Sequence, residues 1–177
     1  AGTMRVSTVQ TLAAYFDDEI TAMPNLVTVG ATQQLTTLAG IPFYSDSTSL
    51  YTHNVSGTDD TATHNTAIGF TAMDAITTGD NTTALGYGAL GANTTGYNNT
   101  AVGSNALILN STGNENVGIG SYSLDANTTG GLNTAIGHNS LGANSTASNN
   151  TAVGNSALKA NTTGTENVAV GYKALTT

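Results

Sequence analysis

The chain has 177 residues, the size of one or two small domains, with 38% hydrophobic residues, 8% charged residues and a formal net charge of −8. Arg5, Lys159 and Lys173 are its only cations, so it has no basic stripe to neutralise phosphates, and we expect no nucleic-acid partner. The absence of cysteine excludes a disulfide framework and a thiolate metal site, and no apolar run approaches the roughly 18 residues of a membrane span.

The N-terminal region, residues 1–24, is predicted to be helical because its apolar side chains follow a heptad spacing. The seam residues are Val9, Leu12, Phe16 and Met23. Pro24 ends the helix, and Glu19 on the seam argues against a long coiled coil. We therefore predict a short helix that self-associates, as in a trimeric coiled coil; a solitary amphipathic helix is the alternative. The first residues lack the charged and apolar segments of a signal peptide.

Residues 25–64 are predicted to form a connector, with short strands at 26–29 and 35–38. An apolar segment follows at 41–44, and residues 45–64 are rich in Ser, Thr and Asp, which is typical of extended chain or loop. The repeat that follows does not extend back into this region in register, so we place the start of the repeat domain at residue 65.

From residue 65 to residue 177 a unit of seventeen residues recurs without insertion or deletion. The unit reads N-T-A-V-G-x-x-A-L-x-x-N-T-T-G-x-x, and we number its positions from Asn65. Coils 1 to 6 then begin at residues 65, 82, 99, 116, 133 and 150, and coil 7 begins at residue 167. This period is too short for a helix pair or a propeller blade. It predicts an all-β solenoid in which each coil has two short strands and two turns.

Glycine occupies the fifth position of every coil. These residues are Gly69, Gly86, Gly103, Gly120, Gly137, Gly154 and Gly171. A glycine needed in each coil implies a backbone angle, or a close approach, that a Cβ atom would forbid.

Asparagine occupies the twelfth position in coils 2 to 6, where coil 1 has Ile76. These residues are Asn93, Asn110, Asn127, Asn144 and Asn161. Coils stack at about 4.8 Å, a spacing at which Asn amides form ladders. We therefore predict a ladder along the stack, followed by a Thr-Thr-Gly turn.

Large apolar residues fill the fourth and ninth positions, and Ala, Gly or Ser fill the third and eighth. Alternation along a strand therefore gives each strand one large apolar face and one face of small residues. Burying two large side chains per coil contributes less free energy than the conformational entropy lost when seventeen residues become ordered. A second buried face is therefore needed to stabilise the coil. We expect the small-residue row to let another chain approach closely, in a homotrimer around a fibre axis. The pattern leaves open which face is the interior and which is the chain–chain interface.

The unit Asn-Thr-Ala-Val-Gly-x-x-Ala-Leu with its Asn-Thr-Thr-Gly turn resembles the head repeat of trimeric autotransporter adhesins, Asn-Ser-Val-Ala-Ile-Gly. That resemblance implies a left-handed parallel β-roll of three identical chains, although the adhesin coil is shorter than this one. Units of the form Asn-Thr-Ala-Val-Gly-Tyr-x-Ala-Leu are also similar to repeats in the tail fibres of bacteriophages. The resemblance covers residues 65–177, about two thirds of the chain.

Four tyrosines at variable positions are the candidate ligand contacts. They are Tyr87, Tyr97, Tyr122 and Tyr172. Aromatic rings on an Asn- and Thr-rich surface suit saccharide contacts, and scattered surface aromatics without a ligand are the alternative. We expect no catalytic residue, metal or cofactor. The histidines His53, His64 and His138 are isolated, and the G-x-G-x-x-G match from Gly86 to Gly91 is not followed by a helix.

These observations predict a non-enzymatic fibrous protein. The missing signal peptide favours a virion tail fibre that acts as a shaft and contacts host surface polysaccharide. The head of a bacterial cell-surface adhesin is the alternative. An ice-binding solenoid is a further alternative, but it needs an alternating Thr-x-Thr face. The threonines at the thirteenth and fourteenth positions are adjacent in sequence and lie at a turn.

Overall fold

The computed structural model describes residues 37–38, 41–42, 44–45, 50–51 and 61–176. The chain divides into two units at residues 42 and 43, and each is described by itself. In the first, β1 (Thr37–Leu38) pairs antiparallel with β2 (Ile41–Pro42). The strand expected at 35–38 is thus present in its second half. The helix expected in residues 1–24 and the strand expected at 26–29 lie outside the described residues.

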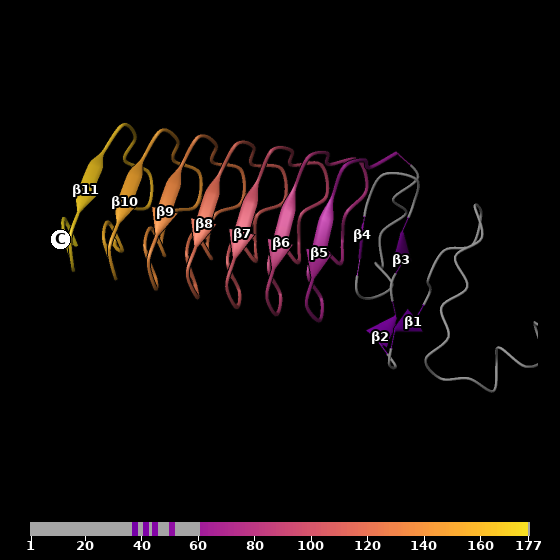
Figure 1. Ribbon diagram of the computed structural model, residues 1–177. Helices are drawn as coiled ribbons and strands as arrows, with labels where there is room; N and C mark the ends of the chain where they lie inside the picture. Colours follow the sequence, from indigo (N-terminus) through magenta and orange to yellow (C-terminus); the bar gives the residue numbers. More distant parts are fainter. Residues whose placement is uncertain (1–36, 39–40, 43, 46–49, 52–60, 177) are drawn as a thin grey trace, which may run out of the picture. The chain divides into compact units, whose positions relative to one another are not determined.

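The second unit is a β-solenoid of about seven turns, and its described residues contain no helix (Figure 1). It begins with β3 (Tyr44–Ser45), which pairs antiparallel with β4 (Leu50–Tyr51). Every later pairing is parallel. The strands are β5 (Thr66–Ile68), β6 (Thr83–Leu85), β7 (Thr100–Val102), β8 (Val117–Ile119), β9 (Thr134–Ile136), β10 (Thr151–Val153) and β11 (Val168–Val170). The predicted parallel solenoid is confirmed.

The parallel part of the sheet starts one strand before the sequence repeat, at β4. Tyr51 of β4 pairs with Ala67 of β5, and this offset is one residue shorter than the repeat unit. Every later pair is offset by the full repeat unit, as in Ala67 with Ala84. Because this first offset is one residue short of the repeat unit, the sequence repeat does not extend back to β4 in register. The pairing of β4 with β5 is nevertheless parallel, like the later pairings.

Each coil has one three-residue strand, so the expectation of two strands per coil is wrong. The ninth residue lies in a turn with left-handed backbone angles, φ between 49° and 53° in all seven coils. This conformation costs roughly 1–2 kcal/mol for a residue with a Cβ atom. Burying a leucine or methionine side chain contributes about 1.5–3 kcal/mol, which outweighs that cost. The left-handed turn therefore serves to aim the ninth side chain inward.

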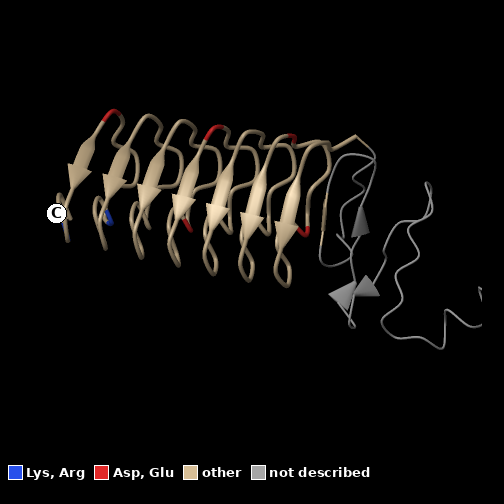
Figure 2. Ribbon diagram, viewed as in Figure 1, with Lys and Arg blue, Asp and Glu red and all other residues tan. Residues whose placement is uncertain are grey.

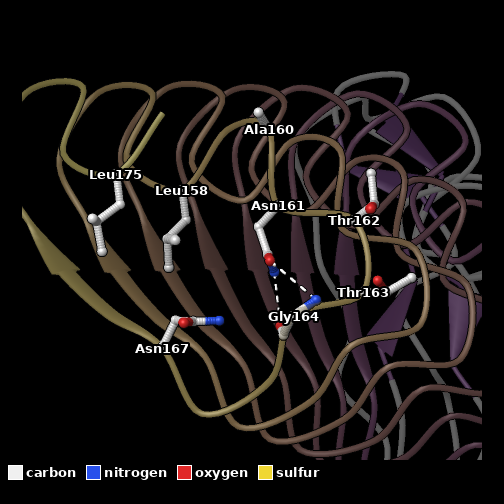
Figure 3. A pocket seen from close by; sticks show the side chains of 8 residues that line it. All are labelled: Leu158, Ala160, Asn161, Thr162, Thr163, Gly164, Asn167 and Leu175. Atoms are coloured by element: carbon white, nitrogen blue, oxygen red, sulfur yellow. Dashed lines mark hydrogen bonds between the residues drawn. The ribbon is translucent and has the colours of Figure 1, made fainter. Parts of the chain in front are cut away.

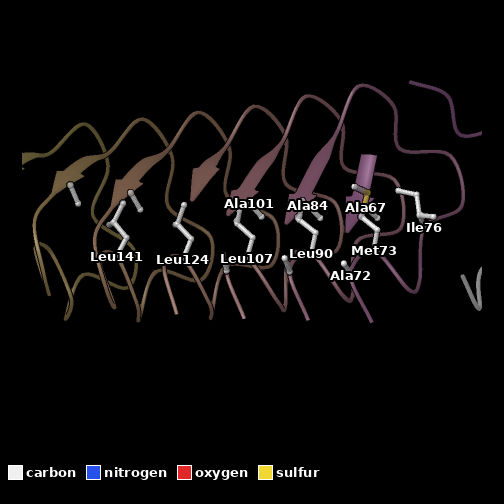
Figure 4. Close-up of a cluster of buried hydrophobic side chains, with 14 of the residues drawn as sticks. Ala67, Ala72, Met73, Ile76, Ala84, Leu90, Ala101, Leu107, Leu124 and Leu141 are labelled. Atoms are coloured by element: carbon white, nitrogen blue, oxygen red, sulfur yellow. The ribbon is translucent and has the colours of Figure 1, made fainter. Parts of the chain in front are cut away.

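The interior of the solenoid is built from small residues, ninth-position side chains and amides. The third-position alanines are buried, for example Ala84 and Ala101 at 0% exposure. Figure 4 shows the ninth-position side chains of Met73, Leu90 and Leu107 in one row beside them, continued by Leu124 and Leu141. The small-residue row is therefore inside the coil, and the expectation that it admits a second chain is wrong.

Two asparagine ladders run through this interior. The predicted ladder at the twelfth position is present, because the Asn127 amide donates to Asn110 Oδ1 at 2.8 Å and the Asn144 amide donates to Asn127 Oδ1 at 3.1 Å. A second ladder joins the first-position asparagines, as in Asn133 Nδ2 to Asn116 Oδ1 at 3.1 Å. This second ladder was not predicted, although Asn occupies the first position in six of the seven coils, with Thr82 in coil 2.

The fifth-position glycines of coils 1 to 6 meet both conditions predicted for them, and Gly171 in coil 7 meets only the backbone-angle condition. Their φ values are between 130° and 139°, which L residues with a side chain rarely adopt. A Cβ atom added to Gly103 would also lie 2.7 Å from the backbone carbonyl carbon of Gly120 in the next coil. Adjacent coils therefore touch backbone to backbone at this turn.

Candidate functional site

The outward side of the sheet carries a row of aliphatic side chains, which we call the outer strip. It consists of the fourth-position residues Ile68, Leu85, Val102, Ile119, Ile136, Val153 and Val170. Alternation along each strand turns these side chains away from the buried third-position alanines. None of them is buried: Leu85 is 46% exposed and Ile119 is 38% exposed. The sequence pattern predicted one strand face of large residues and one of small residues. The structure shows that the large fourth-position residues are on the outer face.

Threonine forms a second outward row at the second position, next to the outer strip. Its members are Thr66, Thr83, Thr100, Thr134 and Thr151, with Val117 in coil 4 and Val168 in coil 7. The outer face thus reads Thr-x-aliphatic along β5, β6, β7, β9 and β10, and Val-x-aliphatic along β8 and β11. The thirteenth-position hydroxyls are engaged between coils, as in Thr94 Oγ1 to Ser111 O at 3.0 Å. An ice-binding face of the Thr-x-Thr kind would need threonine at both the second and the fourth positions. Only the second-position row consists mainly of threonine, so one of the two rows is present, and it is not at the thirteenth and fourteenth positions.

The four candidate tyrosines are all exposed, but the structure does not gather them into one site. Tyr87, Tyr122 and Tyr172 follow strands β6, β8 and β11, so intervening coils separate them. Tyr97 precedes β7, and its backbone N–H donates to Asn114 Oδ1 at 2.9 Å.

Two of these tyrosines have an aromatic neighbour in the adjacent coil. Phe70 and Tyr87 stack with ring centroids 6.2 Å apart and an interplanar angle of 18°. Tyr122 and His138 meet edge to face at 6.2 Å. Tyr172 instead lies under the ammonium group of Lys173 at 5.2 Å. Both rings of the stacked pair are exposed, Phe70 at 71% and Tyr87 at 56%.

Asp125 is the acidic residue with the most unusual surroundings in the described part of the chain. Its Oδ1 atom is buried and accepts no hydrogen bond. Burial raises the pKa of the Asp125 carboxyl, and this outweighs the opposing effects of nearby backbone N–H groups and of the charges of Lys159 and His138. One poorly solvated carboxyl without a catalytic partner does not make an active site.

A polar cavity of about 340 Å³ lies at the last coils (Figure 3). Its lining includes Leu158, Leu175, Asn161 and Asn167, which occupy the ninth, twelfth and first repeat positions. Those positions face the interior in earlier coils, so the cavity is the solenoid interior seen at coil 7. Its lining contains no charged side chain and none of the candidate tyrosines.

Within the described residues, no group of three or more His, Cys, Asp or Glu side chains is placed to hold a metal ion. The same residues include no helix long and apolar enough to cross a membrane. Comparison with family models, with curated proteins and with solved structures finds no match.

Proposed function

We propose that this chain is a shaft segment of a non-enzymatic fibrous protein of the bacteriophage tail-fibre type, assembled as a homotrimer on the virion. The observation that supports this proposal is the repetition of one coil with constant register from β5 to β11. Each coil adds a fixed rise of about 4.8 Å, so the number of coils sets the length of the stack. A left-handed coil and a helical segment in residues 1–24 that joins the three chains complete the proposal.

The contacts between coils suit a shaft that must resist bending. Backbone groups join neighbouring coils outside the strands as well, for example Leu90 N–H to the Ala106 carbonyl at 3.0 Å. The two buried ladders add side-chain bonds along the same axis, so bending the stack would strain bonds on several sides of each coil. Charged side chains are few, and Figure 2 shows them in the turns of the solenoid, which leaves the strands uncharged.

The proposed adhesive role is contact with bacterial surface polysaccharide through exposed aromatic rings. The stacked rings of Phe70 and Tyr87 offer apolar faces against which sugar C–H groups can pack. Asn and Thr side chains nearby supply hydrogen-bond partners for hydroxyl groups. In this reading Tyr87, Tyr97, Tyr122 and Tyr172 are separate contact points along one shaft.

Retention on immobilised bacterial surface polysaccharide tests the adhesive role. The intact protein is expected to be retained, and a variant with Tyr87→Ala, Tyr97→Ala and Tyr122→Ala is expected to lose retention. A matched control carries Thr95→Ala, Thr112→Ala and Thr129→Ala, three exposed turn positions, and should be retained like the parent. Equal behaviour of the two variants would contradict recognition by the shaft and reduce the segment to a spacer.

A further inference from the structure

The outer strip is an unusual surface for a protein that works as a single chain. It is aliphatic in every coil, and seven strands at about 4.8 Å spacing make it roughly 29 Å long. Continuous apolar surface of this kind typically marks an interaction site. The second-position row beside it is threonine or valine, so the whole outer face of the sheet is without charge.

Charge also bears on which partner fits this face. The described residues carry five acidic side chains, Asp74, Asp80, Glu115, Asp125 and Glu166. All five lie outside the strands (Figure 2). Two copies that met through their turns would bring like charges together, whereas copies that meet through the outer strip would not. The strip is therefore the surface on which this acidic chain is best able to approach itself.

We propose that copies of this chain pack outer strip against outer strip, parallel and with equal coils at equal height. A partner that fills the strip along its length must present apolar groups at the same repeat distance. A second copy has that repeat distance by construction, because every coil has the same length. This proposal rests on the homotrimeric fibre proposed above: three copies related by one axis run parallel, and equivalent residues lie at equal heights.

Single cysteines test both the face and the direction, because the parent chain contains none. Val102→Cys, on the strip in coil 3, is expected to form a disulfide-linked dimer in mild oxidant, since the proposed geometry brings equivalent residues within disulfide range. Thr112→Cys, at an exposed turn of the same coil, is the matched control and should remain uncrosslinked. If cross-linking required a mixture of Val102→Cys and Ile136→Cys, which lie in coils 3 and 5, the copies would be antiparallel and the proposal would be wrong.

The mass of the particle in solution provides a second test. It is measured without any cross-link, so a chance cross-link between copies cannot affect it. Multi-angle light scattering of the parent chain should give three times 17.7 kDa. Ile119→Asp should lower that mass at a concentration where Thr129→Asp leaves it unchanged, with circular dichroism to verify folding. An Ile119→Asp variant that keeps the parent mass would overturn the proposal. A monomeric parent would overturn it too, and thermal hysteresis in dilute solution would then assign the face to ice.

These results are separable from those on adhesion. A trimer that cross-links at Val102→Cys but is not retained on polysaccharide would support the interface and contradict the adhesive role. A trimer that is retained but fails to cross-link would support the adhesive role and contradict the interface.

Discussion

The third and fourth positions of each strand are neighbours in sequence, yet they lie in opposite environments. At the third position a small residue is buried, as at Ala135. At the fourth position a large aliphatic residue is exposed, as at Ile136, which is 38% exposed. Size and burial are thus inverted relative to an ordinary strand, where the larger apolar residue faces the core. The interior is narrow and in coils 3 to 6 already holds one leucine and two amides per coil, so the larger strand residue is left outside.

The inner and outer apolar positions should respond differently to truncation, and this is the largest effect we expect. Leu124→Ala should lower the free energy of unfolding by about 2–5 kcal/mol, because it leaves a cavity inside coil 4. The loss should be the same at all protein concentrations. Ile119→Ala in the same coil should act mainly through association, so its effect should change with concentration. Equal, concentration-independent losses in chemical denaturation would show that both positions belong to one core.

Two fifth-position glycines, Gly103 and Gly171, allow the effect of close backbone packing to be compared with the effect of the backbone angle. Gly103 has the next coil against it, whereas a Cβ atom on Gly171 would meet only Ala174 Cβ, at 4.0 Å. Their φ values are similar, 134° and 130°. Gly103→Ala should therefore cost about 1–3 kcal/mol more than Gly171→Ala, and the difference measures the close approach of backbones apart from the backbone angle. Thermal unfolding of both variants tests this, and equal losses would mean that the angle alone selects glycine.

The first-position ladder can be lengthened rather than broken. Thr82 interrupts it, and only the Thr82 backbone N–H reaches Asn65 Oδ1, at 2.9 Å. Thr82→Asn should raise the free energy of unfolding by about 0.5–1.5 kcal/mol, because it adds an amide bond of the kind seen between Asn133 and Asn116. Asn133→Thr is the reverse change and should destabilise the protein. A neutral Thr82→Asn would indicate that the ladder depends on neighbours that coil 2 lacks.

The smallest predicted effect concerns pH. Because the folded-state pKa of Asp125 is raised, the folded chain binds its proton more tightly than the unfolded chain does. The resulting stabilisation is fully present below the unfolded pKa of about 3.9 and is lost as the pH rises through the folded pKa. Asp125→Asn should remove this component and unfold at a slightly higher temperature than the parent at neutral pH. A parent and variant with identical pH profiles of melting temperature would contradict the raised pKa.

Periodicity was enough to predict the parallel solenoid, the glycine turn and the twelfth-position ladder, because each depends on contacts between identical positions of adjacent coils. Two features depend on the path of the chain within one coil and were not predicted. Leucine usually avoids left-handed backbone angles, so the turn at Leu90 and its equivalents read as a strand. The orientation of the strand was also undetermined, since alternation separates two faces without saying which one is enclosed.

The candidate site was harder to predict than the fold. Tyr87 and Tyr122 occupy the sixth and seventh positions, whose residue type changes from coil to coil, so the period does not predict what they contact. The stacking of Phe70 on Tyr87 follows only when two coils are placed in register, because the two residues are one repeat unit apart.

The ladders also give the stack an electrical direction. In both, the amide of each coil donates toward the preceding coil, as from Asn127 to Asn110 and from Asn133 to Asn116. Backbone bonds between coils run both ways, since Thr100 N–H donates forward to Asn116 and Gly103 N–H donates backward to Leu85. Within each ladder, by contrast, all the amides donate in the same direction, so their dipoles add along the axis, as peptide dipoles do along a helix. Each further coil therefore polarises the amides already aligned, and the strength of a ladder bond grows with the length of the uninterrupted row.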